Sequence, residues 1–174
     1  LNFVKDNISK FEGDINVDLS GNTIDNLVGD VFVKHATYHN TKATYSIDEF
    51  YINSAFDQNR VRTITVNSGD IVDGVVVGKF YFNQLQKLVT NSLGSLYENY
   101  KPIKVNKGQF LKFDFTIHNK IIEIFYPEVS IATNTVVKGT INSDNQEFKL
   151  NFNSPKITAS DNTFDNINVS VDNK

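Results

Sequence analysis

The chain has 174 residues, of which 40% are hydrophobic and 21% charged, so it has the composition of a folded domain and is long enough to bury a core. Its net charge of −3, with lysines dispersed along the chain, argues against nucleic-acid binding and against simple electrostatic attachment to anionic lipid. The absence of cysteine excludes disulfides, thiolate metal sites and thiol nucleophiles, and no apolar run approaches the ~18 residues of a membrane span.

The first part of the chain alternates apolar and polar side chains, which is typical of strands with one buried face. Ile15, Val17 and Leu19 fall on one side of the first such stretch, and polar residues fall on the other. Polar turns separate the stretches at residues 20–22, 39–42 and 57–59. The pattern predicts strands over residues 10–20, 30–38, 46–56 and 60–67.

The apolar period changes in the stretch that follows. Gly74–Phe82 is rich in β-branched and aromatic residues and predicts a strand. Residues 83–100 predict the one helix of the chain, with Asn83 as its N-cap and its end before Pro102. Its apolar stripe, at steps of three and four, is Leu85, Leu88, Val89, Leu93, Leu96, Tyr97 and Tyr100.

The rest of the chain returns to strands. A long strand follows Gly108, and residues 121–126 predict a short one that Pro127 interrupts. Further strands are expected over residues 129–141, over 147–153 before a break at Pro155, and over 164–172. Their one-sided apolar residues include Phe113, Phe115, Ile117, Val129, Ile131, Val137, Ile141, Phe148, Leu150, Phe152, Ile167, Val169 and Val171.

About ten alternating strands with a turn every ten or so residues favour a mostly β, largely antiparallel fold. Two arrangements fit: a β-sandwich with two apolar faces closed on each other, or an open curved sheet with an accessible apolar side. The residues alone favour the sandwich, because monomers rarely leave large apolar patches uncovered. Residues 20–30 weakly resemble residues 68–74, so we expect residues 1–174 to be one segment of a longer repetitive protein.

No catalytic or metal-binding motif is recognisable. His35 and His39 span a strand end and a turn, without the acidic residue of a metalloprotease helix, and His118 falls on the polar side of its strand, exposed to solvent. Carboxylates are scattered singly, and the apolar face has no polar residues with which to build a catalytic pocket. We therefore expect a protein that is not an enzyme and that has no cofactor and no metal.

Four stretches can be compared with a known family: residues 11–22, residues 27–31, residues 62–68 with Asp73-Gly74, and residues 78–85 leading into the predicted helix and Tyr100. They resemble the TamB translocation and assembly module, in its Bacteroidetes form, within the AsmA-like family of envelope proteins. The resemblance is best over residues 10–102; beyond Gly108 only the general one-sided β pattern matches. The family offers no catalytic motif to compare.

This resemblance implies an open half-pipe, or β-taco, with an apolar groove. It also implies a periplasmic location with an inner-membrane anchor outside this segment, and an Omp85-type barrel as partner. The implied role is outer-membrane biogenesis, through protein assembly, phospholipid transport between the membranes, or both. The groove would then be lined by Ile15, Val17, Leu19, Val31, Val33, Ile64, Val66, Phe113, Phe115, Ile117, Val129, Ile131, Val137, Ile141, Phe148, Leu150, Phe152, Ile167, Val169 and Val171.

Two uses of such a groove stay open. It could hold phospholipid acyl chains, each methylene gaining about 0.8 kcal/mol on leaving water. Alternatively, a nascent outer-membrane strand could pair with an exposed edge of the sheet. The helix would either cover an edge or a mouth of the groove, or pack on the sheet to complete the core. A different class of function, an adhesin or carbohydrate-binding β domain, would predict a closed core and a cluster of polar loops.

Overall fold

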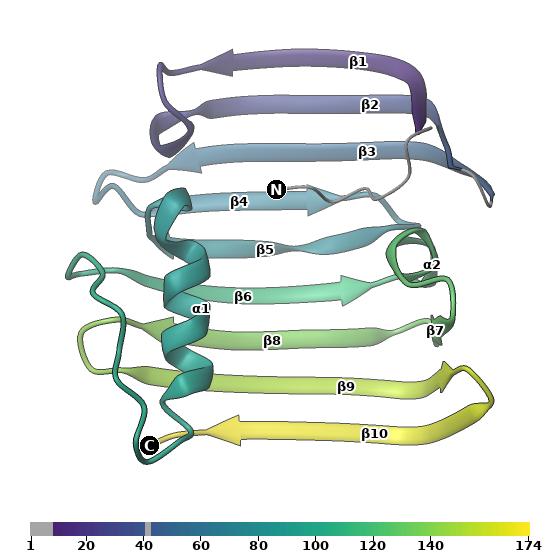
Figure 1. Ribbon diagram of the computed structural model, residues 1–174. Coiled ribbons are helices and arrows are strands. Elements are labelled where there is room, and N and C mark those ends of the chain that lie inside the picture. The colour runs from purple at the N-terminus through teal and green to yellow at the C-terminus, as the bar shows by residue number, and fades with distance from the viewer. Residues whose placement is uncertain (1–8, 41–42) are drawn as a thin grey trace.

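A computed structural model describes residues 9–40 and 43–174. Within these residues the strands form one open, antiparallel sheet, consistent with the expected curved half-pipe (Figure 1). The mostly β fold class is therefore confirmed. The alternative of a sandwich is wrong for the described part of the chain, because all ten of its strands belong to a single sheet. The predicted turn at 39–42 lies partly outside the described residues.

The strands follow the predicted alternation closely. The sheet is built from β1 (Lys10–Ser20), β2 (Val28–His39), β3 (Thr44–Phe56), β4 (Arg62–Asn67), β5 (Val72–Lys79), β6 (Phe110–Ile117), β7 (Val129–Ile131), β8 (Thr135–Asn142), β9 (Glu147–Ala159) and β10 (Asn162–Asp172). Their spatial order is β1-β2-β3-β4-β5-β6-β8-β9-β10, and β7 pairs with the far end of β9. Apart from β7, consecutive strands of the chain are thus neighbours in the sheet, and β1 and β10 form its two edges.

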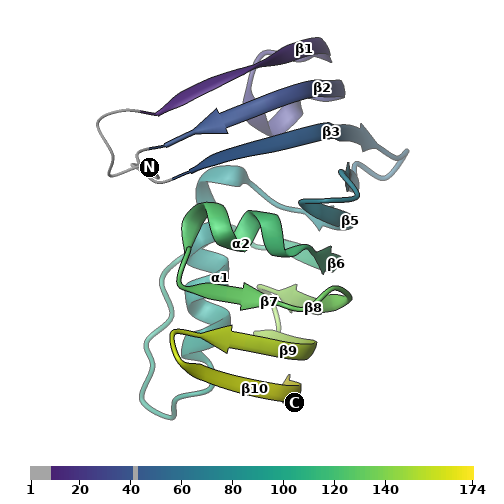
Figure 2. The ribbon, with the colours of Figure 1, turned by 90° about the vertical axis from the view of Figure 1, so that its right-hand side faces the viewer.

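Two α-helices lie against the same face of this sheet, as Figure 2 shows. The first, α1 (Leu85–Gly94), crosses in front of the central strands near one end of them (Figure 1). The second, α2 (Asn119–Phe125), lies towards the other end of the strands. Two single turns of 3₁₀-helix, Ile24–Asn26 and Phe82–Gln84, precede β2 and α1 respectively.

The core of the protein lies under α1. Leu88 of the helix is buried against Leu111, Ile141 and Phe148 of the sheet. The helix therefore packs on the sheet to complete the core, which was one of the two roles left open for it. The part of the face that α1 does not reach has fewer buried side chains.

The helix is shorter than the predicted range of 83–100. Asn83 lies in the 3₁₀ turn, and Gln84 occupies the N-cap position without a side-chain capping bond, so the predicted role of Asn83 is wrong. The helix ends at Gly94 because the chain turns back there. The Tyr100 ring lies against Gly94, so closely that a Cβ atom on this glycine would be 2.5 Å from ring carbons.

The stretch after β6 is helical, whereas a strand was predicted over residues 121–126. The side chains of Ile121, Ile124 and Phe125 in α2 project together towards β2 and β3, which is possible only with helical spacing. The predicted strand over residues 129–141 is also divided, into β7 and β8. Asn134, between them, has a φ of +65° and so interrupts the extended backbone.

β9 continues through Pro155, where the sequence predicted a break. β8 pairs with β9 up to Asn153, and β7 pairs with it from Ile157 onward, so Pro155 lies in the gap between them. On the other side, the pairs with β10 are made by Ser154 and Lys156. The missing N–H of proline therefore removes no bond from the ladder.

Candidate functional site

One face of the sheet is apolar from edge to edge. Residues that are directly opposite each other in neighbouring strands point to the same face, so cross-strand pairs define continuous rows. One row crosses nine strands without a polar residue: Val17, Val31, Ile52, Val66, Gly74, Phe115, Val137, Phe152 and Val169. We call the surface built by this row and its parallel neighbours the apolar face.

The predicted lining residues fall on this face almost without exception. Those in the edge-to-edge row are Val17, Val31, Val66, Phe115, Val137, Phe152 and Val169. The adjacent row on one side holds Leu19, Ile64, Phe113, Leu150 and Val171, and the next row beyond it holds Ile141 and Phe148. On the other side lie Ile15, Val33, Ile117 and Ile167. Val129 and Ile131 lie instead on the short strand β7, outside these rows.

Access to the apolar face varies along it. Ile141 and Phe148 are buried in the core under α1. By contrast, Ile15 is 57% exposed and Val17 56% exposed on the edge strand β1, and Val169 on β10 is 45% exposed. No member of the edge-to-edge row is buried. The face is therefore covered locally by the helices and otherwise open to solvent.

Two apolar hollows lie on this face. The first, which we call the α1 hollow, has a volume of about 450 Å³ and lies between α1 and the sheet. Leu85, Val89 and Leu93 form its helical wall. Its remaining lining is entirely apolar and comes from Ile64, Val76, Phe80, Phe82, Leu111, Phe113, Phe115, Val137, Ile141, Phe148 and Leu150.

The second, the α2 hollow, measures about 490 Å³ and lies between α2 and β1–β3. It is lined by Phe11, Val33, Tyr38, Ile47, Phe50, Ile71, Ile121, Ile124 and Phe125. Polar bonds fix α2 in place. The Lys120 ammonium donates to the Ser46 carbonyl at 2.6 Å and pairs with Asp70, and the Tyr45 hydroxyl donates to the Glu123 carbonyl at 3.2 Å.

Two phenylalanines shape the floor of the α1 hollow. Phe115 lies over Gly74 on one neighbouring strand, and Phe113 lies over Gly139 on the other. A Cβ atom on either glycine would be 2.4 Å from the ring, so only glycine leaves space for these rings to lie along the sheet. The two rings stack with their centroids 6.4 Å apart. The two rings thus form an aromatic part of the floor of the hollow, beside Val76 and Val137.

Asparagines anchor α1 at the place where it forms the wall of the hollow. The Asn91 side-chain oxygen accepts from Ile103 N–H at 2.8 Å and from the Tyr100 hydroxyl at 2.9 Å, and its amide donates to the Ile103 carbonyl. The Asn173 amide donates to the Ser95 hydroxyl and to the Gln146 carbonyl, both at 2.7 Å. These bonds attach the end of the helix to the following loop and to the sheet.

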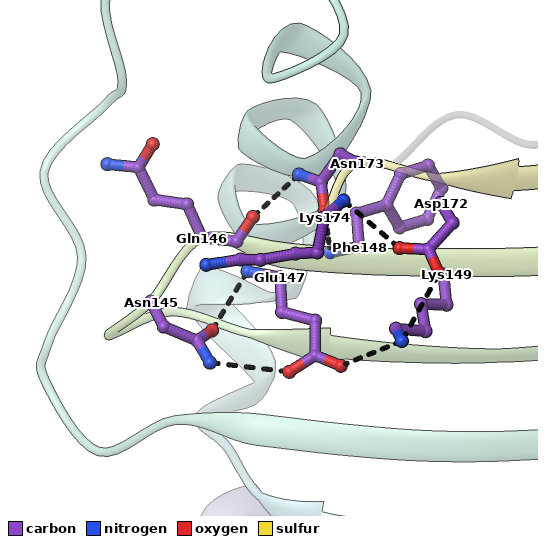
Figure 3. A network of polar contacts seen from close by, with 8 residues as sticks. All are labelled: Asn145, Gln146, Glu147, Phe148, Lys149, Asp172, Asn173 and Lys174. Atoms are coloured by element: carbon purple, nitrogen blue, oxygen red, sulfur yellow. Dashed lines mark hydrogen bonds and ion pairs between the residues drawn. The ribbon is translucent and has the colours of Figure 1, made fainter.

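Figure 3 shows the polar network around the end of β10. Asn173 accepts a bond from the Phe148 N–H at 2.8 Å, while Asp172 pairs with Lys149 at 3.2 Å. The bond from the Lys174 N–H, together with Lys149, lowers the pKa of Asp172 below its ordinary range. The network joins the last residues of the chain to β9, next to the α1 wall.

The histidines do not form a site. His35 is exposed and lies 3.4 Å from the Asp14 carboxylate, while His39 contacts the Thr44 hydroxyl. His118 was expected on the solvated side of its strand, and this is wrong. It is half-buried, with Nε2 2.8 Å from the Asp73 carboxylate, because it follows the end of β6 and lies against the start of β5. No group of three or more metal-ligating side chains occurs within the described residues.

Sequence reasoning predicted the helix that forms the α1 wall, but it missed α2 and one charged residue of the apolar face. The spacing of Ile121, Ile124 and Phe125 was a signal for α2. Arg62 lies in the row of Gly78, Leu111 and Ile141 and is only 3% exposed. Burial lowers the pKa of its guanidinium, and the Asp25 carboxylate opposes that shift. Its place among turn-flanking polar residues gave no indication that it would be buried.

Comparisons with known proteins add no family to this description. No protein-family model, curated protein or solved structure matches the chain. In the part of the chain that the structure describes, no helix is long and apolar enough to span a membrane.

Proposed function

We propose that the chain is one segment of a TamB-like protein of the bacterial envelope, whose apolar face holds phospholipid acyl chains between the inner and outer membranes. The observation that carries this proposal is the edge-to-edge row, which crosses nine strands without a polar side chain and without a buried member. An apolar surface of this extent is unusual on a protein that functions alone in water. The resemblance of residues 10–102 to that family supports the same reading.

In this proposal the lipid is bound non-covalently, by the hydrophobic effect. An acyl chain placed on the apolar face leaves water, with a gain of about 0.8 kcal/mol per methylene. Because the apolar face is continuous between strands, the acyl chain could move along it without losing this favourable free energy. Such a segment would need an anchor in the inner membrane and a partner in the outer membrane, and the resemblance implies an Omp85-type barrel there.

A second use is favoured by a separate observation, the two open edges of the sheet. Within the described residues, β1 and β10 have 11 residues each and have no strand on their outer side. A nascent outer-membrane strand could pair with such an edge through main-chain hydrogen bonds. A glycan-binding domain would instead be expected to have a closed core, and the open sheet does not support that alternative.

Photo-crosslinking in cells tests the lipid proposal. A benzophenone amino acid placed at Val89 or Phe115 would project into the α1 hollow, and one placed at Lys112 would lie on the opposite face of β6. We expect labelled phospholipid to be captured from the first two positions and not from the third. Equal capture from all three positions, or none from Val89 and Phe115 while the protein is expressed and folded, would contradict the proposal.

A further inference from the structure

A cationic pocket adjoins the apolar α1 hollow. It has a volume of about 320 Å³ and is lined by four cations, Arg60, Arg62, Lys79 and Lys107, and by a single carboxylate, Asp25. Phe80 lines both this pocket and the α1 hollow, so the charged and the apolar space share a wall. The concentration of positive charge contrasts with the net charge of −3 of the whole chain.

The four cations of this pocket outnumber its one carboxylate, and none of them forms an ion pair within the described residues. Four lysines elsewhere in the described residues, Lys10, Lys120, Lys138 and Lys149, do pair with carboxylates. Among residues 9–40 and 43–174, no carboxylate forms an ion pair with Arg60, Arg62, Lys79 or Lys107. The Asp25 side chain instead accepts a bond from the Phe82 N–H at 2.8 Å. The pocket therefore has an excess of positive charge next to a low-dielectric surface.

Arg62 is held in a fixed position within this pocket. It donates to the Asp25 carbonyl and, at 3.3 Å, to the Ser54 hydroxyl. Its guanidinium lies 4.5 Å from the centroid of the Phe56 ring, and the Arg60 guanidinium lies 5.5 Å from the same ring. The Phe56 ring thus positions two guanidinium groups beside the cationic pocket. Guanidinium groups ordered in this way are suited to bind phosphate oxygens.

We propose that this pocket binds the phosphate of a phospholipid headgroup while the acyl chain of the same lipid passes Phe80 into the α1 hollow. The inference rests on the proposed function and adds the ligand class, an anionic glycerophospholipid. The headgroup phosphate would supply the negative charge that the pocket lacks. The shared wall at Phe80 places the two halves of an amphipathic molecule in adjacent spaces of matching chemistry.

Calorimetric titration of the whole chain with three short-chain probes below their micelle concentrations tests this proposal. The probes are dihexanoyl phosphatidylglycerol, the uncharged dihexanoylglycerol, and glycerol 3-phosphate. We expect the anionic lipid to bind about tenfold or more tightly than the uncharged one, because charge-assisted hydrogen bonds to phosphate add to the apolar contact. Glycerol 3-phosphate, which lacks acyl chains, should bind most weakly.

A triple variant, Arg60→Gln, Lys79→Gln and Lys107→Gln, removes three exposed cations and leaves the buried Arg62 in place, so we expect it to fold, which circular dichroism checks. It should lose the preference for the anionic lipid and keep its affinity for dihexanoylglycerol. The matched control, Lys112→Gln, Lys138→Gln and Lys149→Gln, makes the same charge change on the opposite face of the sheet. It should bind all three probes as the wild type does.

The outcomes separate this inference from the function on which it rests. If dihexanoylglycerol binds and phosphatidylglycerol binds no more tightly, the headgroup site is wrong and the acyl-binding face stands. If neither lipid binds, both proposals fail. Equal losses in the two triple variants, or glycerol 3-phosphate binding as tightly as the lipid, would also overturn the headgroup site, the latter in favour of a site for free phosphate.

Discussion

The Asp73 carboxylate connects three separate parts of the chain. It accepts bonds from the N–H groups of Ser68 at 2.9 Å and Gly69 at 3.1 Å, and it lies 2.8 Å from His118 after β6. Partial burial acts to raise the pKa of Asp73, but the His118 contact and the two N–H bonds together outweigh it and leave the pKa below its ordinary value. A depressed carboxyl pKa means that the ionised form is stabilised by folding.

We therefore expect Asp73→Asn to destabilise the protein at neutral pH and less so in acid. The contribution of Asp73 is fully present above the ordinary aspartate pKa of about 3.9, and it is lost as pH falls through the lower, folded-state value. Because the side chain is partly exposed, the loss at pH 7 should be about 1 kcal/mol. Urea unfolding of both proteins from pH 7 to about pH 2 measures the difference, and a difference that stayed constant over this range would contradict the assignment.

The α1 helix presents one leucine to the core and another to the open hollow, which gives a matched comparison. Leu88 is 2% exposed and contacts the core cluster, while Leu93 is 48% exposed. Leu88→Ala should lower the free energy of unfolding by about 2–5 kcal/mol, because it leaves a cavity under the helix. Leu93→Ala should lower it by about 1 kcal/mol or less.

Urea unfolding and helical circular dichroism measure both leucine variants. Equal losses would mean that the helix does not pack on the sheet through Leu88. If Leu93→Ala is well folded but binds lipid more weakly, the proposed role of the hollow gains support, because Leu93 lines that hollow without holding the helix in place.

The elements also show what local sequence can and cannot predict. Strict alternation predicted the strands and the apolar face, because period two is a property of the strand itself. The break at Pro155 was wrong, because the ladder has a gap where its N–H would bond, and only the positions of β7 and β8 create that gap. The end of α1 depends on Asn91, which bonds Ile103 twelve residues away. Such long-range contacts are invisible to a local pattern.

The open shape of the whole molecule was the least predictable feature. Alternation fits a closed sandwich and an open sheet equally, and the choice depends on whether a second layer covers the apolar side. Here two helices cover parts of that side, and the edge-to-edge row stays partly exposed, with Val17 and Val169 exposed on the two edge strands. An apolar face of this kind is a surface for self-association whenever nothing else occupies it.

We therefore expect the isolated chain to associate through its apolar face as its concentration rises. The double variant Val17→Lys and Val169→Lys places a charge at each end of the edge-to-edge row and should shift association to concentrations at least about tenfold higher, because burying an unpaired lysine is costly. The matched control, Asn16→Lys and Asn168→Lys, adds the same charges to the same two strands on the opposite face. Sedimentation velocity over a concentration series measures both. If the two double variants reduced association equally, the contact would be made by strand edges or governed by net charge. If only the valine variant reduces association, the molecules contact each other through the apolar face, and the same face is available to an apolar ligand.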